Sequence, residues 1–470
     1  MRTSQPRVKF SAIRRPPTAA VVAVAYAAAI SMAALDSQIV NVALPTLGRV
    51  FHASIASVQW TVLGYVLSLA VMIPASGWIG DRVGTKRTFV AAIGLFTLAS
   101  ALCGGASSLA ELVAARIIQG IGGGMLIPTA TAMLFRAYPP ERRARIMRLL
   151  VLPTLVGPAC APVLGGVLTQ EASWRWVFFI NVPVGVVVFM FCAANLQEHR
   201  EQARGSFDIV GFLLGGGGLS LALYALSEGS VRGWSSPGIV ASAVLAVAAL
   251  ALFVRVESRA AAPLLNVGLL RDRLFRATNL VGMLHAGAFL GILYLTPVFL
   301  QEAQHRSPTS SGTTTFLEAL GVLAASQPVG RLYPKLGPRK LACTGAVAVC
   351  ALLLCFQLVD TGTSLWLVRG QMFLLGAASV AAFLAVQASM FTTISGADTG
   401  HASAIYNTGR QVAIAGCVAI LSAIVASVAG PRLVAFHVAF LVAAALAALA
   451  ALTAYTLIRT SDAALSMSNR

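Results

Sequence analysis

The first residues that suggest chemistry form a polar group within an apolar stretch near the N-terminus. The sequence LDSQIVNVALP, residues 35–45, combines one carboxylic acid, Asp36, with a serine and two amides. A carboxylate in the middle of a membrane span costs about 2.5–3.5 kcal/mol on insertion scales, so such residues usually serve a function. With a helical rise of 1.5 Å per residue, Asp36 lies roughly 13 Å from the end of the span at Pro45. Asp36 is therefore a candidate for binding and releasing a proton.

A basic partner for this acid is available in a later apolar stretch. The sequence RIIQGIGGG, residues 116–124, places Arg116 a few residues inside its span, at the same membrane face that Pro45 approaches. An ion pair between Asp36 and Arg116 is thus geometrically possible. Burial favours a protonated carboxylic acid, whereas a nearby guanidinium favours the carboxylate, so a movement that separates the pair would move a proton. The alternative is a static ion pair that joins two helices, and we favour the proton switch.

Three amide side chains accompany this pair. Gln38 and Asn41 are three residues apart and share one helix face. Asn41 lies about 140° around the helix from Asp36, so the span is polar on more than one side and is expected to face protein and a cavity. Each amide would bind substrate or bond to a neighbouring helix, and the sequence leaves both interpretations open. Gln119 lies on the same side of its helix as Arg116.

The second half of the chain carries its own polar residues within apolar stretches. Glu318 would be a second proton carrier, a cation site, or a partner for Arg410. A single intramembrane histidine, such as His285, is more often a structural hydrogen-bond partner than a ligand. Arg410 has Asn407 close by in the sequence. These four residues join Gln38, Asn41 and Gln119 as candidates for the substrate cavity.

Composition places all of these residues in a membrane. The 470 residues are 57% hydrophobic and 11% charged, whereas soluble domains carry about 25% charged residues. Apolar stretches of about 20 residues predict an all-α integral membrane protein of about 14 transmembrane helices. The predicted spans are 20–44, 58–79, 88–105, 112–134, 149–168, 176–196, 209–226, 239–254, 278–300, 313–330, 341–358, 365–391, 402–429 and 433–457.

Basic residues predict the orientation of these spans. Most of the 34 Lys and Arg residues cluster in alternate loops, and such loops face the cytoplasm. Both termini are therefore expected there, and we expect the first span to be retained in the mature protein rather than cleaved as a signal peptide. The net charge of +18 then reflects topology, and no nucleic-acid partner is expected. The loops of the opposite side hold only Arg49, Arg175, Arg232, Arg306 and Arg432.

An internal repeat indicates two halves. Two loops, GWIGDRVGTKR and GRLYPKLGPRK, match at Gly77 with Gly330 and at Gly84 with Gly337. Arg116 matches Arg369 at the same offset. Two parallel halves of six spans, with two spans inserted between them, are typical of a transporter; a packing duplication in a receptor or membrane enzyme is the alternative. The expected units are a basic tail (1–18), a six-helix bundle (19–200), an inserted helix pair (207–256), a second six-helix bundle (277–459) and a tail (460–470).

The first of these loops has the features of a gate. Besides Gly77 and Gly84, it carries Asp81 and Arg82. Asp81 would cap a helix N-terminus or pair with basic neighbours, and so clamp the two bundles in one state. The matching position of the second half is Pro334, which lacks a carboxylate, so the latch is expected on one side only.

A second packing motif is VGPACAPVLGG, residues 156–166. Pro158 and Pro162 each remove a helical hydrogen bond and bend the span. Gly157, Gly165 and Gly166 allow close helix contact at the bend. We therefore expect either a hinge or a tightly packed interface between the halves.

Other classes of protein lack support in the sequence. The seven cysteines show no metal-ligand spacing such as C-x-x-C, and no G-x-x-x-x-G-K-[ST] phosphate-binding loop is present. Neither H-E-x-x-H nor G-x-S-x-G occurs, and loops of about 20 residues are too short for a soluble domain. We therefore expect no metal, no cofactor and no enzymatic activity, and a membrane sensor is disfavoured.

These motifs resemble the major facilitator superfamily, and within it the fourteen-span drug:proton antiporter branch. LDSQIVNVALP resembles the first-span motif of the branch, with Gln38 where a threonine is usual. GWIGDRVGTKR resembles the loop between spans two and three, RIIQG the fourth-span motif, and GPACAPVLGG the fifth-span antiporter motif, with Ala161 where a glycine is usual. WRWVFFINVPVG, residues 174–185, resembles the sixth-span entrance.

The resemblance implies a major facilitator fold and a role in proton coupling for Arg116. It implies an exporter in the cytoplasmic membrane of a bacterium that exchanges protons for drugs or other small, largely apolar or cationic compounds. The partners would be membrane lipid, protons and the small-molecule substrate, with a proton gradient in place of a cofactor. The alternatives are a dedicated exporter of one metabolite and a proton-coupled importer.

Overall fold

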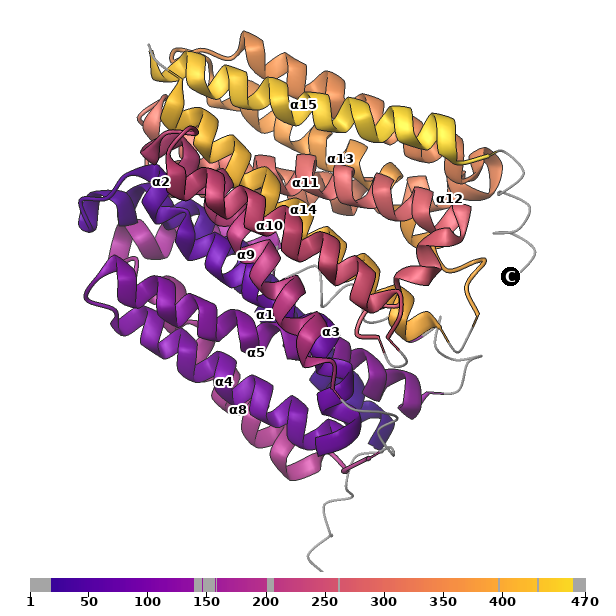
Figure 1. Ribbon diagram of the computed structural model, residues 1–470. Helices are drawn as coiled ribbons and strands as arrows, with labels where there is room; N and C mark the ends of the chain where they lie inside the picture. Colours follow the sequence, from indigo (N-terminus) through magenta and orange to yellow (C-terminus); the bar gives the residue numbers. More distant parts are fainter. Residues whose placement is uncertain are drawn as a thin grey trace, which may run out of the picture.

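The computed structural model describes residues 18–138, 146, 157, 159–200, 207–260, 263–395, 398–428 and 431–459, and across these residues the fold is helical without strands (Figure 1). The all-α prediction is confirmed.

The helices follow one another along the chain in three groups. The first half holds α1 (Thr18–Val50), α2 (Ile55–Val58), α3 (Trp60–Val83), α4 (Thr85–Gly105), α5 (Leu109–Ala137), the π-helix η1 (Leu168–Ala172), α7 (Trp176–Phe179) and α8 (Asn181–Asn195). The inserted segment holds α9 (Ile209–Arg232) and α10 (Pro237–Glu257). The second half holds η2 (Val267–Arg271), α11 (Arg273–Glu302), α12 (Pro308–Cys355), η3 (Phe356–Leu358), α13 (Leu365–Ser389), α14 (Thr399–Ser427) and α15 (Arg432–Leu457).

Twelve helices in the described part of the chain are long and apolar enough to cross a membrane. One of these, α12, is interrupted at Gly337, whose backbone leaves the helical region. It therefore corresponds to two predicted spans, 313–330 and 341–358. Much of the predicted fifth span, 149–168, lies outside the described residues. The multi-pass architecture is thus shown, whereas the count of fourteen remains a prediction.

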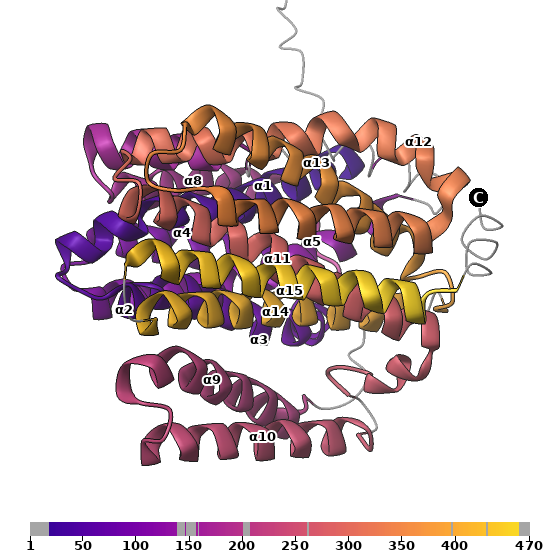
Figure 2. The same cartoon turned by 90° about the horizontal axis from the view of Figure 1, so that it is seen from above.

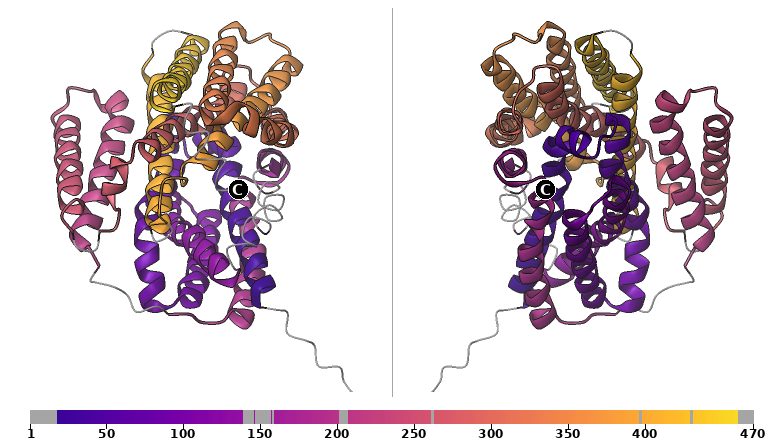
Figure 3. Two further views of the ribbon diagram at one scale, coloured as in Figure 1. Left: turned by 90° about the vertical axis from the view of Figure 1, so that its right-hand side faces the viewer. Right: turned by 90° about the vertical axis from the view of Figure 1, so that its left-hand side faces the viewer.

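The helices form two bundles with a separate pair beside them. Helices α1 to α8 lie together, α11 to α15 form the second group, and α9 and α10 stand to one side of both (Figures 2 and 3). The pair is attached through α9, which packs against α3 of the first bundle and α14 of the second. Gly215–Gly218 does not interrupt α9. Apolar residues dominate the exposed surface of α10, as expected for a helix that faces lipid.

The backbone supports the internal repeat. Gly84 joins α3 to α4 with a φ of 109°, and Gly337 joins the two parts of α12 with a φ of 72°. These are the glycines that match between the two loop sequences. Positive φ strains most other residues, so both halves use a glycine to reverse the chain at the same point of the repeat.

The two bundles meet at one end of the molecule. We call this the outer end, defined by residues 42–59, 162–175 and 300–312, because the basic loops predict that the opposite end faces the cytoplasm. There, Gln301 Nε2 of α11 donates to the Val42 carbonyl of α1 at 2.9 Å. The Thr309 backbone N–H donates to Gln170 Oε1 at 3.3 Å.

Glycines bring the bundles still closer at the outer end. A Cβ on Gly166 would stand 2.6 Å from the Pro308 carbonyl, and a Cβ on Gly312 would collide with the Pro162 carbonyl. Backbone meets backbone here without intervening side chains. The structure therefore represents a state in which the outer end is closed.

Candidate functional site

The centre of the first bundle contains a buried ion pair. Arg116 Nη1 donates to Asp36 Oδ2 at 2.6 Å, and the two side chains are 1% and 0% exposed. The structure thus brings together the two residues that the sequence proposed as partners. Charged hydrogen bonds of this kind are among the strongest in proteins, and removing one partner from a buried pair costs about 3–5 kcal/mol.

The other oxygen of the Asp36 carboxylate is held by two amides. Gln119 Nε2 donates to Asp36 Oδ1 at 2.9 Å, and Asn181 Nδ2 donates to the same atom at 2.8 Å. Asn181 lies at the start of α8 and also donates to Ser100 Oγ of α4 at 3.3 Å. The Asp36 carboxylate therefore connects α1, α5 and α8, and Asn181 extends this network to α4.

Arg116 is equally well surrounded. Its Nε donates to the Thr61 carbonyl at 2.9 Å, and its Nη1 also donates to Gln119 Oε1 at 2.7 Å. The guanidinium carbon lies 4.2 Å from the ring centroid of Tyr65 and 5.7 Å from that of Phe178, which are favourable cation–π geometries. The Arg116 guanidinium is thus hydrogen-bonded along its edge and packed against aromatic rings on its face.

Glycines allow the helices to approach closely enough for these contacts. A Cβ on Gly120 would collide with the Tyr65 carbonyl, and one on Gly124 would stand 2.8 Å from the Leu69 carbonyl. This small-residue ridge packs α5 on α3. The ridge therefore positions Arg116 beside Thr61 and Tyr65, which agrees with its interpretation as a packing feature.

The geometry defines what the site can do. Protonation of Asp36 would remove the negative charge from the ion pair and from both amide contacts at once. The contacts that α5 and α8 make with α1 at this carboxylate would then weaken, because a neutral acid binds a guanidinium less strongly. Asp36 can thus couple proton occupancy to helix packing. Its role in transport remains a prediction.

Sequence reasoning missed two members of this site. Asn181 and Ser100 belong to apolar spans, and only their position in the fold reveals that Asn181 donates to Asp36 and that Ser100 accepts from Asn181. The available signal was the lone amide in FFINVPVG, where an unpartnered polar group within lipid would be costly. The resemblance of this segment to a family motif gave no role for the amide.

We expect Asn181→Ala to destabilise the protein by about 1.5–3 kcal/mol, the usual contribution of a hydrogen bond to a charged group. The proton-driven transport rate should fall as well, because Asp36 loses one of its ligands. Thermal unfolding in detergent and transport in vesicles measure the two effects. Asn195→Ala is the matched control on the same helix, since within the described part of the chain Asn195 donates only to the Phe191 carbonyl. Equal behaviour of the two variants would contradict this role.

Of the other predicted cavity residues, Gln38 and Asn41 bond to each other. Asn41 Nδ2 donates to Gln38 Oε1 at 3.1 Å, and Asn41 Oδ1 is buried without a partner among the described residues. Among the described residues, neither amide bonds across to a neighbouring helix. Substrate binding and helix contact both stay predictions for Gln38 and Asn41.

The candidates of the second bundle do not form one cluster. Among the described residues, neither Glu318, which is 8% exposed, nor Arg410 forms an ion pair, so the proposed pairing between them is not formed. Asn407 Nδ2 donates to the Ser403 carbonyl of its own helix at 2.9 Å. The carbonyl of Glu318 lies against Gly376 of α13, where a Cβ would collide with it.

His285 is buried in the second bundle, where its ring lies beside the backbone of Ser379. The ring also stacks on Phe289 at a centroid distance of 6.1 Å and meets the edge of Phe383 at 6.3 Å. Its role as a structural hydrogen-bond partner stays a prediction.

The gate loop forms the second of its two expected arrangements. Asp81 lies in the last turn of α3 and pairs with Arg136 of α5 at 3.4 Å, so it joins two helices of the same bundle at the inner end. Arg82 stacks over Trp78 at 5.3 Å. Gly77 has open space around its Cβ position, and the clamping function remains a prediction.

Gly84 has a second constraint besides its backbone conformation. A Cβ there would meet the carboxylate of Glu198, which accepts from the backbone N–H groups of Lys86 and Arg87 at 3.1 and 3.3 Å. The carboxylate binds the exposed donors at the N-terminus of α4. The segment that follows α8 is thereby fastened to the gate loop.

The fifth-span motif forms a tight interface. A Cβ on Gly157 would stand 2.7 Å from the Ser31 carbonyl, and one on Gly165 would stand 2.6 Å from the Ile39 carbonyl, both in α1. Gly166 and Pro162 make the contacts with α12 described above. Pro158 lies outside the described residues. The motif thus packs against both the helix that carries Asp36 and the second bundle.

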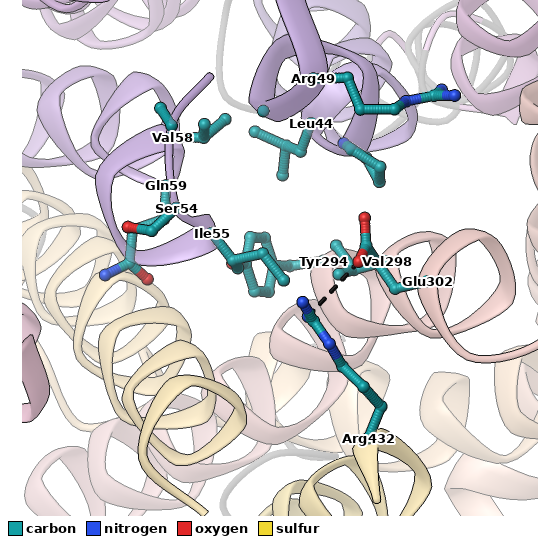
Figure 4. Close-up of a pocket in the computed structure, with 13 residues that line it drawn as sticks. Leu44, Arg49, Ser54, Ile55, Val58, Gln59, Tyr294, Val298, Glu302 and Arg432 are labelled. Carbon is teal, nitrogen blue, oxygen red and sulfur yellow. Dashed lines mark ion pairs between the residues drawn. The ribbon is translucent and has the colours of Figure 1, made fainter. Parts of the chain in front are cut away.

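A cavity of about 210 Å³ lies at the outer end, lined by residues of both bundles (Figure 4). Leu44 and Arg49 of α1 line one side, and Tyr294 of α11 lines the other. Arg432 of α15 points towards Glu302 of α11 and pairs with it at 3.4 Å, both on the side of the second bundle. None of the predicted site residues lines this cavity, and the ion pair around Asp36 lies deeper in the first bundle.

Comparison with known sequences identifies the family. The model of the Major Facilitator Superfamily matches residues 26–208, 203–415 and 278–468. The chain belongs to the major facilitator superfamily. The family that the motifs indicated is therefore confirmed, and the helical bundles described here are those of a superfamily member.

Curated relatives in the superfamily include drug-resistance proteins. A multidrug resistance protein B homolog of Mycobacterium tuberculosis is 35% identical over 322 residues, which cover 68% of this chain but only 60% of that protein. A putative multidrug resistance protein MdtD of Serratia proteamaculans is 34% identical over 351 residues, covering 73% of this chain and 72% of that protein. The match to the mycobacterial relative thus spans less than two thirds of its length.

Solved structures of transporters share the fold. A peptide transporter POT in complex with sulfate aligns with a TM-score of 0.68 at 14% identity and covers 94% of this chain and 95% of that chain. A D-xylose–proton symporter aligns with a TM-score of 0.68 at 15% identity and covers 95% and 99%. At this level of identity the likeness concerns the fold alone.

Proposed function

We propose that this chain is a proton-coupled exporter of drugs or other small, largely apolar or cationic compounds. The buried pair of Asp36 and Arg116 carries the proposal, because it offers an ionisable group where α1, α5 and α8 meet. The names of the curated relatives support a drug exporter over a carrier of one metabolite. The location would be the cytoplasmic membrane of a bacterium, with both termini in the cytoplasm.

The proton gradient supplies enough free energy without a cofactor. One pH unit contributes about 1.36 kcal/mol per proton, and 100 mV adds about 2.3 kcal/mol per charge. Two protons would therefore drive an accumulation of several hundred-fold or more. In this scheme an external proton binds Asp36 while the outer end is open and favours closure of that end, and its release to the cytoplasm in exchange for substrate lets the outer end open again.

Efflux of fluorescent dyes from vesicles tests the function. We expect dye export when the gradient is imposed, and loss of export when a protonophore dissipates it. Imposing the gradient in the opposite direction separates an exporter from an importer. Export of one compound only, among a panel of cationic and neutral dyes, would identify a dedicated exporter. Export that persists with the protonophore would contradict proton coupling.

Glu318 is proposed to recognise cationic substrates from the second bundle. A buried acid without a countercharge among the described residues would bind a cation more strongly than it would in water. Glu318→Gln should therefore reduce export of cationic dyes by about tenfold, equivalent to 1.4 kcal/mol, and leave neutral dyes unaffected. Glu171→Gln, which removes an exposed carboxylate, is the control. Equal losses for both dye classes would instead indicate a proton carrier.

A further inference from the structure

Two carboxylates meet at the base of the inserted helix pair. Asp208 caps the N-terminus of α9, where its Oδ1 accepts from the Gly211 backbone N–H at 2.8 Å. Glu257 is the last residue of α10, and its Oε2 accepts from the Leu265 backbone N–H at 3.2 Å. Each carboxylate thus uses one oxygen to bind a backbone donor.

The remaining oxygen of each carboxylate is buried and has no hydrogen-bond partner. These two atoms, Asp208 Oδ2 and Glu257 Oε1, each lie 2.6 Å from the position that a Cβ on Gly211 would take. The two oxygens are therefore separated by no more than twice 2.6 Å, and Gly211 places no side chain between them. Glu257 as a whole is only 2% exposed. Among the described residues, no lysine or arginine pairs with either acid.

This arrangement requires a positive charge. Two buried carboxylates at such a separation repel each other, and burial without a countercharge penalises both. Each carboxylate also accepts from one backbone N–H group, and Asp208 lies at the N-terminus of α9, an end that attracts negative charge. A cation between the free oxygens would offset the repulsion and leave both backbone hydrogen bonds in place.

We propose that Asp208 and Glu257 bind one divalent metal cation of the Mg²⁺ type. Hard cations take oxygen ligands, and Mg²⁺ is commonly bound by one or two carboxylates while it keeps several of its waters. Gly211 leaves space beside the two oxygens that any side chain would fill. The site would join the connection that ends at Asp208 to the connection that contains Leu265, and these lead to the first and second bundles respectively.

Binding of Mn²⁺ to the purified full-length protein tests the site. Free Mn²⁺ gives an electron paramagnetic resonance signal that disappears on binding, and Mg²⁺ competes for the same ligands. We expect one Mn²⁺ per chain, displaced by Mg²⁺, with affinity lowered at least tenfold in Asp208→Asn and in Glu257→Gln. Asparagine caps helices as well as aspartate does, so Asp208→Asn removes the charge and keeps the cap.

Two further variants make the result decisive. Gly211→Ala keeps both acids and places a methyl group between them, so it should also lose Mn²⁺ if the protein retains its thermal stability. Glu171→Gln removes an exposed carboxylate elsewhere and should bind like the wild type. Equal Mn²⁺ binding by all variants would mean adventitious binding and overturn the proposal. A third outcome is that the wild type binds no Mn²⁺ but becomes more stable at acid pH, while the variants that lack one acid do not. The two acids would then share a proton, which would overturn the metal site. None of these outcomes depends on transport activity.

Discussion

Asp36→Asn is expected to abolish proton-driven efflux while the protein still inserts in the membrane. Asparagine has the shape of aspartate but cannot bind and release a proton at neutral pH. The substitution also leaves the buried Arg116 charge without its anion, which costs about 3–5 kcal/mol of stability. Dye efflux driven by an imposed pH gradient, together with the amount of protein in the membrane, measures both effects.

The loss of stability must be separated from the loss of coupling. The double variant Asp36→Asn with Arg116→Gln removes both charges, so it should recover part of the stability and none of the proton-driven efflux. Ser37→Ala is the control on the same helix, because among the described residues Ser37 Oγ bonds only to the Ala34 carbonyl of its own helix. Wild-type efflux by Asp36→Asn would mean that the ion pair is static and that the proton binds elsewhere.

Gly312→Leu is expected to prevent closure of the outer end and so to stop transport. Even a Cβ at this position collides with the Pro162 carbonyl, and the two backbones cannot both keep their places. Overpacking of this kind costs about 1–3 kcal/mol, which corresponds to a shift of roughly 5–150-fold towards the state with an open outer end. The folded protein remains intact, because the strain is relieved when the bundles separate.

Labelling from outside measures this shift. A cysteine at Val42, which is fully buried in the closed state, should react with a membrane-impermeant maleimide faster when Gly312 is replaced. Gly330→Leu is the control in the same helix, since a Cβ there meets nothing within 4 Å. Unchanged labelling combined with normal efflux would show that the outer end does not open between Gly312 and Pro162.

The helices and the central ion pair could largely be predicted because each depends on local information. Apolar stretches of about 20 residues identify spans, and Thr399–Ser427 and Arg432–Leu457 begin and end within a few residues of the predicted limits. Asp36 and Arg116 were recognisable because charge within a span is costly. Glu318 and Arg410 were equally recognisable, yet they do not pair, because depth in the membrane does not determine which helix faces another.

The sequence by itself determined the membrane class, the repeat, the family and the two charged residues of the ion pair. Hydropathy and sequence motifs depend on residues that are close together in the chain, so they can be recognised without the fold. Only the tertiary structure decided the ligands of the pair. Asn181 follows Asp36 by more than a hundred residues, and it reaches the carboxylate because α1, α5 and α8 converge there. The same holds for Asp208 and Glu257, the two ends of a helix hairpin. Hydrogen bonds between distant segments depend on how helices turn and cross, and only packing of the whole chain sets those angles.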